Sequence, residues 1–70
     1  MKTEEAIEAI AIDDAQKAYR DLSVYRIDMV RKGRIWEVAF NFKDETINGG
    51  GPYYEIDAET GAIIKKIYYQ

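Results

Sequence analysis

Carboxylates are the most numerous reactive side chains in this sequence. Asp and Glu supply 13 of its 70 residues, and it contains no His and no Cys. Two carboxylates can act as general acid and general base when they face one cleft and one has a raised pKa, but no spacing here marks such a pair. The missing His and Cys remove the usual zinc ligands, the thiol nucleophile and the commonest general base. The sequence therefore predicts no catalytic residue, no metal site and no cofactor, and indicates a protein that is not an enzyme.

Two loops contain residue types that are also found in ligand sites. Asp57, Glu59 and Gly61 resemble the start of a calcium loop, but Tyr68 occupies the place of the bidentate Glu that such a loop needs. The glycines Gly49, Gly50 and Gly51 could surround a phosphate, but Pro and a predicted strand follow them, whereas phosphate loops lead into a helix. We interpret the first loop as a tight turn and the second as a flexible connection that can become ordered on a partner.

Basic side chains gather at a predicted turn, where Arg31, Lys32 and Arg34 surround Gly33. Such a cluster can bind phosphate, RNA or an acidic protein, or it can be a solvated hairpin tip. The net charge of the chain is −3. This balance argues against nucleic-acid binding, which depends on neutralising phosphates.

Two pairs of adjacent tyrosines, Tyr53–Tyr54 and Tyr68–Tyr69, lie in predicted strands. Because side chains alternate along a strand, one tyrosine of each pair faces outward. Tyr is enriched at interface hot spots, although cross-strand packing that stiffens the sheet is an equal alternative. The sequence thus predicts a partner-binding set that combines these tyrosines with the basic turn and the glycine loop: Tyr53, Tyr54, Tyr68, Tyr69, Arg31, Lys32, Arg34, Gly49, Gly50 and Gly51.

The elements that position these residues change character near residue 23. Before that point, Thr3 can cap a helix and apolar residues recur at helical spacing as far as Leu22. We expect one helix over about 3–21, although Asp13 and Gln16 have capping-box spacing and leave open two shorter helices.

After residue 23 the pattern alternates as in strands, with a sheet over about 24–69. Trp36, Val38, Phe40 and Phe42 share one face of the clearest strand, and we expect the helix to cover them. In the last strand, Ile63 and Ile67 are expected to share a face. The fold class is α+β: one N-terminal helix packed on a four-stranded antiparallel meander, within a single domain over 1–70.

Three segments in order carry a family resemblance: a Trp-x-Val strand over Ile35–Phe40, the loop Gly49–Pro52, and Ile-Asp-x-x-Thr-Gly-x-Ile over Ile56–Ile63. This order resembles the PepSY domain, and also a group of small bacterial immunity proteins with a cystatin-like or nuclear-transport-factor-like fold. Either resemblance implies a cystatin-like architecture, in which a helix packs on a curved antiparallel sheet. Either also implies a bacterial protein that lacks enzymatic activity and binds, in some cases inhibits, another protein.

We therefore predict a non-enzymatic protein-binding module whose partner, by resemblance, is a peptidase or a toxin enzyme. The alternative is a small domain that self-associates, as a homodimer or by swapping elements across the glycine loop. No apolar run approaches the roughly 20 residues of a membrane span. We expect a soluble protein, cytoplasmic as the chain stands, or periplasmic or secreted if a leader has been removed.

Overall fold

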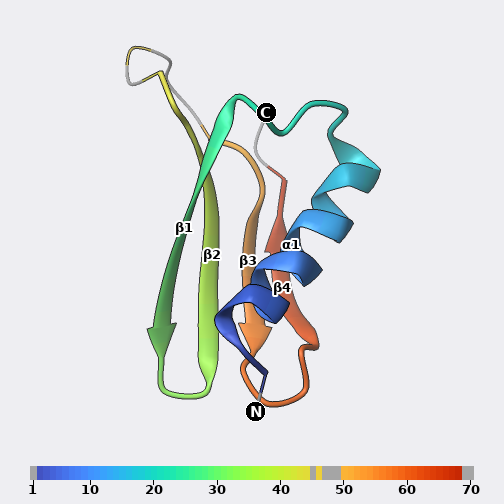
Figure 1. Cartoon of the computed structure of the whole chain (residues 1–70), viewed down its shortest axis with the longest axis vertical. Coiled ribbons are helices and arrows are strands. Elements are labelled where there is room, and N and C mark those ends of the chain that lie inside the picture. Colours follow the sequence, from blue (N-terminus) through green and yellow to red (C-terminus); the bar gives the residue numbers. More distant parts are fainter. Residues whose placement is uncertain (1, 45, 47–49, 69–70) are drawn as a thin grey trace.

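One helix precedes four strands in the structure, a computed structural model that describes residues 2–44, 46 and 50–68 (Figure 1). Helix α1 spans Glu4–Ala18, and the strands are β1 (Tyr25–Lys32), β2 (Ile35–Phe42), β3 (Tyr53–Asp57) and β4 (Ile63–Ile67). The strands pair antiparallel in the order β1-β2-β3-β4. This arrangement confirms the predicted α+β meander.

Local hydrogen bonds accompany both ends of helix α1. The Thr3 Oγ1 atom accepts from the Ala6 backbone N–H at 3.1 Å, as expected for an N-cap. The helix continues through Asp13, so the alternative of two shorter helices is not realised. It ends three residues before the predicted limit. There, Asp21 accepts from both the backbone N–H and the hydroxyl of Ser23, and this local turn competes with further helix.

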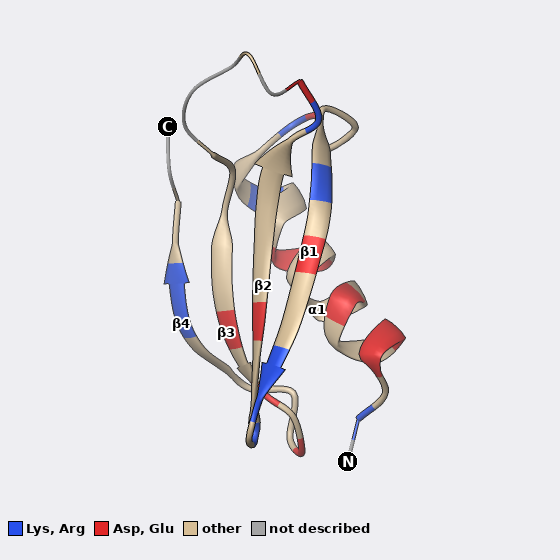
Figure 2. Cartoon of the chain, turned by 90° about the vertical axis from the view of Figure 1, so that its left-hand side faces the viewer, with Lys and Arg blue, Asp and Glu red and all other residues tan. Residues whose placement is uncertain are grey.

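Helix α1 packs on one face of the sheet, where the core lies (Figures 1 and 2). The face predicted from the alternation in β2 is the one that the helix covers. Trp36 lies at the margin of this core and is only half-buried. Small alanines in α1 allow close approach to the sheet, and the fully buried residues of the cluster are Ile7, Ala11, Ala15, Val38, Phe40, Tyr54 and Ile56.

No element of the described chain covers the opposite face of the sheet, as Figure 2 shows from the β1 side. We call this surface the open face. The pairing of strands aligns two rows of its residues across the sheet. One row runs Asp28, Ala39, Tyr53 and Ile67, and the next runs Val30, Glu37, Glu55 and Lys65.

A β-bulge changes the orientation of the last strand. Tyr53 pairs with Ile67, but Ile56 pairs with Ile63, with a register shift between Glu55 and Ile56. The additional residue in β4 turns Ile63 toward the core, whereas Ile67 stays on the open face. The expectation that Ile63 and Ile67 share a face was therefore wrong.

Two tight turns lie together at one end of the sheet. Gly33 and Gly61 both have positive φ, at 61° and 77°, which a side chain would make unfavourable. In the second turn, predicted from the sequence, Asp57 accepts from the backbone N–H groups of Glu59 and Thr60. Arg34 and Glu59 form an ion pair at 2.8 Å between the two turns. Gly50 and Gly51, by contrast, lie at the other end of the sheet.

Candidate functional site

The adjacent tyrosines of β3 point to opposite faces of the sheet. Tyr54 is fully buried beneath α1, and its hydroxyl donates to the Asp14 Oδ2 atom at 2.9 Å. Tyr53 lies half-buried on the open face, and its hydroxyl donates to the Glu55 Oε2 atom at 3.0 Å. The alternation rule is confirmed for this pair. It also corrects one expected contact, because the buried Tyr54 has no surface to offer a partner.

Asp14 gathers three donors from the sheet, and we call Asp14, Tyr54, Lys66 and Tyr68 the Asp14 cluster. The Tyr68 hydroxyl donates to Oδ2 at 2.6 Å, and Lys66 Nζ lies 3.4 Å from Oδ1. The hydrogen bond from Tyr68, aided by those from Tyr54 and Lys66, lowers the pKa of Asp14 below its usual 3.8 against the opposing effect of burial. Burial, reinforced by Asp14, raises the pKa of Tyr54. The cluster thus joins α1 to β3 and β4 through one carboxylate.

The lowered pKa of Asp14 predicts a specific loss of stability in acid. A carboxyl whose pKa is lower in the folded than in the unfolded protein stabilises the fold above its unfolded pKa, and this contribution disappears as pH falls through the folded pKa. At neutral pH, Asp14→Asn should be less stable than wild type. The difference in free energy of unfolding should narrow as pH falls below about 5 and then through the folded pKa of Asp14, which lies below 3.8, because wild type then loses the same charge.

Urea unfolding of both proteins across this pH range checks the prediction. The comparison isolates Asp14, because Asp21, Asp28, Asp44 and Asp57 also have lowered pKa values and are common to both proteins. A difference that stays constant with pH would show that the charge of Asp14 does not contribute.

Tyr53 is the aromatic residue at the centre of the open face. Its neighbours include Glu55, to which it donates, and Glu37, which lies opposite Glu55 on β2. Burial raises the pKa of Tyr53 to about 12, helped by the hydrogen bond to Glu55 and the charge of Glu37. Lys32 Nζ lies 3.4 Å from Glu37. The Tyr53 hydroxyl is therefore a neutral donor held between two carboxylates.

A shallow hollow of about 340 Å³ borders the same tyrosine. Asn41 is fixed at its rim, because its amide donates to Asp28 at 2.7 Å. At Gly51, an added Cβ would lie 2.7 Å from the Tyr25 ring, so only glycine lets the chain pass this close. The hollow is lined by Ala39, Phe40, Asn41, Gly50, Gly51, Pro52 and Tyr53. Part of the predicted glycine loop thus shapes a concave surface beside Tyr53.

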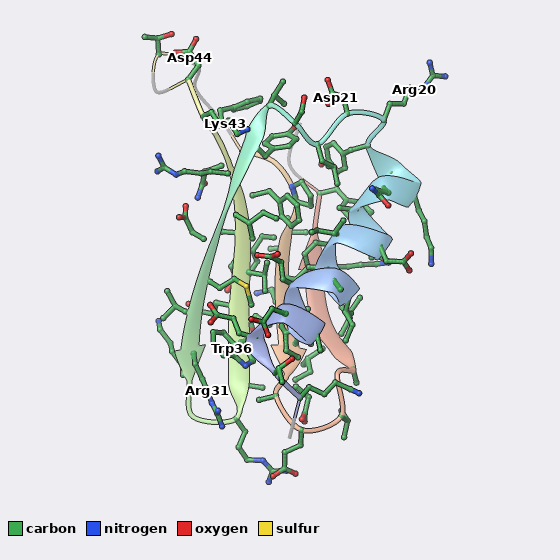
Figure 3. All side chains as sticks on the ribbon, viewed as in Figure 1. Arg20, Asp21, Arg31, Trp36, Lys43 and Asp44 are labelled. Atoms are coloured by element: carbon green, nitrogen blue, oxygen red, sulfur yellow. The ribbon has the colours of Figure 1, made fainter. Side chains whose placement is uncertain are left out.

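The basic turn lies at the opposite end of the sheet from this hollow. Figure 3 shows Arg31 and Trp36 near the β1–β2 turn and Lys43 at the far end. Arg31 donates to the Gly33 carbonyl at 2.9 Å, and Arg34 pairs with Glu59. Lys32 reaches Glu37 on the open face, in the row next to that of Tyr53. The structure therefore separates the basic turn from the tyrosines instead of combining them.

The remaining residues of the predicted partner-binding set do not join Tyr53 on the open face within the described part of the chain. Tyr68 lies on the helix side of the sheet within the Asp14 cluster, 40% exposed. Tyr69 and Gly49 lie outside the described residues. Sequence reasoning missed Glu37 and Glu55 as site residues. The available signal was a single Glu within the apolar strand Ile35–Phe42, which marks a position on its uncovered side.

A family model described as PepSY, peptidase propeptide and YPEB domain, matches residues 2–67. The chain belongs to the PepSY family. The match includes α1 and all four strands of this PepSY domain, and so the whole open face. The family is of a propeptide or inhibitor type and not a catalytic one. No curated protein and no solved structure matched the chain.

Two kinds of feature are absent from the described part of this PepSY domain. No three Asp or Glu side chains there approach one another closely enough to hold a metal ion. The described chain also has no helix with the length and apolar character needed to cross a bilayer.

Proposed function

We propose that this PepSY domain is a non-enzymatic module that binds a peptidase through its open face and holds it inactive. The observation that carries the proposal is the half-buried Tyr53, which lies between a hollow and two carboxylates on a face that no described element covers. Tyr is among the residues that most often dominate binding energy, particularly beside a pocket. The family description supplies the class of partner.

The open face combines the features of an interface core and rim. Ile35, Ala39, Tyr53 and Ile67 are partly buried without being covered, and charged residues surround them. An apolar centre within a polar border is typical of protein–protein interfaces. Toxin neutralisation, the other function expected from the resemblance, receives no support from the matched family, and we do not propose it.

Titration of a peptidase tests the proposal. The tagged domain is used to capture peptidases from a lysate and a secreted fraction of the source organism, and the captured enzyme is purified and assayed. We expect its activity to fall in proportion to added domain until the two are about equimolar, as for tight one-to-one binding. Mass spectrometry of the mixture should find the domain intact, which excludes competition as a substrate. Undiminished activity, or capture of no peptidase, would contradict the proposal.

Self-association is a second candidate, favoured by the exposed edge of the sheet. Strand β1 is an edge strand, and Val30 on it is 52% exposed. An edge strand with exposed apolar residues can pair with a second copy. A mass in light scattering that increases with protein concentration would support self-association. A constant monomer mass would reject it, and the peptidase proposal would then be the one that remains.

A further inference from the structure

We infer that the open face binds an extended segment of its partner that carries a basic side chain two residues from an apolar one. This inference rests on the proposed function, because it names the partner's chemistry at the same surface. Glu37 and Glu55 receive the basic side chain, and the hollow beside Tyr53 receives the apolar one.

The charge requirement comes from the two central strands. Glu37 on β2 and Glu55 on β3 are directly opposite each other, where like charges repel. Lys32 partly neutralises Glu37. Lys65 on β4 lies directly opposite Glu55, but no Lys or Arg forms an ion pair with Glu55 within the described ranges 2–44, 46 and 50–68, and its one hydrogen-bond donor there, Tyr53, is neutral. A partner cation placed between Glu37 and Glu55 would offset their repulsion and supply the hydrogen-bond donors that Lys65 does not give to Glu55.

Arginine fits this place better than lysine. Its planar guanidinium has five N–H donors and can bind two carboxylates, whereas a lysine ammonium acts as a point charge. The exposed fraction of the Glu37 side chain is 29%, so a contact here is less screened than one between fully exposed groups.

The apolar requirement comes from the neighbouring row of the sheet. Ala39 and Tyr53, which line the hollow, each lie two residues along a strand from Glu37 and Glu55. Two residues of a strand span about 6.6 Å, and the side chains at both positions face the same way. An extended partner segment has the same repeat. A basic side chain over the carboxylates therefore places the side chain two residues away over the hollow.

Peptide titrations monitored by NMR test the basic and the apolar contact without the natural partner. The probes are the acetylated, amidated peptides Ser-Thr-Leu-Thr-Arg-Thr-Ser and Ser-Thr-Arg-Thr-Leu-Thr-Ser, which present the pair in both directions. One control replaces Arg by Glu, and another places Leu and Arg next to each other. We expect at least one probe at millimolar concentration to shift the amide signals of Glu37, Ala39, Tyr53 and Glu55, and both controls to bind more weakly.

Variants of the domain distinguish a specific charge contact from nonspecific binding of the peptide. Glu55→Gln should weaken binding of the probe about fivefold, which is the size expected for a partly exposed ion pair. Glu5→Gln, on the exposed side of α1, removes the same charge elsewhere and should change nothing.

Several results would overturn the inference: equal binding of the Arg and Glu peptides, signal changes confined to α1, or no change at up to about 10 mM peptide, tenfold above a Kd of about 1 mM. Signal changes on the open face that depend on protein concentration alone would also overturn it, and would indicate a second copy as occupant. Failure of the peptides beside successful peptidase inhibition would reject this recognition chemistry and leave the proposed function intact. Peptide binding without any peptidase partner would reject the proposed function and leave this recognition chemistry intact.

Discussion

Asp14→Ala should lower the free energy of unfolding by about 2–3 kcal/mol, the cost of removing a charged acceptor from partly buried donors. The substitution leaves the Tyr54 hydroxyl, beneath α1, without its partner, and it also removes the acceptor of Tyr68 and Lys66. Because small domains are only marginally stable, a loss of this size is a large share of the free energy of unfolding. Urea unfolding monitored by the fluorescence of Trp36 measures the change.

The neighbouring residue provides a matched control. The Asp13 side chain is 78% exposed, and among the described residues its one ion pair is the i,i+4 pair with Lys17 at 3.9 Å. Asp13→Ala should therefore change stability by less than about 0.5 kcal/mol, as is usual for exposed pairs. Equal effects of the two substitutions would mean that the Asp14 cluster does not join α1 to the sheet in solution.

Tyr53→Ala should weaken binding of the inhibited peptidase by about 30-fold or more, the loss that defines an interface hot spot. The side chain borders the hollow and lies within the row of the open face that no described element covers. Calorimetry or surface plasmon resonance with the purified peptidase measures the affinity. Circular dichroism should show that the fold is retained, because Tyr53 is outside the buried core.

Lys17→Ala is the control for this second prediction. Lys17 is exposed on α1, which packs on the other face of the sheet, and its removal should leave affinity unchanged. If Tyr53→Ala binds as wild type does, the open face is not the interface. If both variants lose affinity equally, the contact extends over the helix, and the proposed surface would need to move there.

The change of residue pattern near position 23 was sufficient to predict the helix, the strands and their order. Alternation in β2 also identified the core face, because period-2 patterns determine which side chains share a face. The end of the helix was less predictable, since it depends on the competing hydrogen bonds of Asp21 with Ser23. The family could be recognised from the order of three short segments, and the match over residues 2–67 selected between the two groups.

The site was harder to predict, because it depends on register between distant segments. Alternation requires one tyrosine of Tyr53–Tyr54 to face outward, but only the pairing with β2 decides which. The contacts of Asp14 join residues 40 and 54 positions apart, for which a single sequence carries no signal. The bulge in β4 could not be predicted either. The sequence Ile63–Ile67 is compatible with either face of the sheet, and only the packing of Ile63 on the core reveals the shift in register.

The most direct test of the account is a site-specific photo-crosslink. A benzoylphenylalanine is introduced at Tyr53 in one sample and at Lys17 in another, and each domain is mixed with the inhibited peptidase and irradiated. The account predicts a crosslinked product of one domain and one peptidase from position 53, and none from position 17. Crosslinking from position 17 with none from position 53 would contradict it, because the partner would then lie on the helix and the open face would be left free.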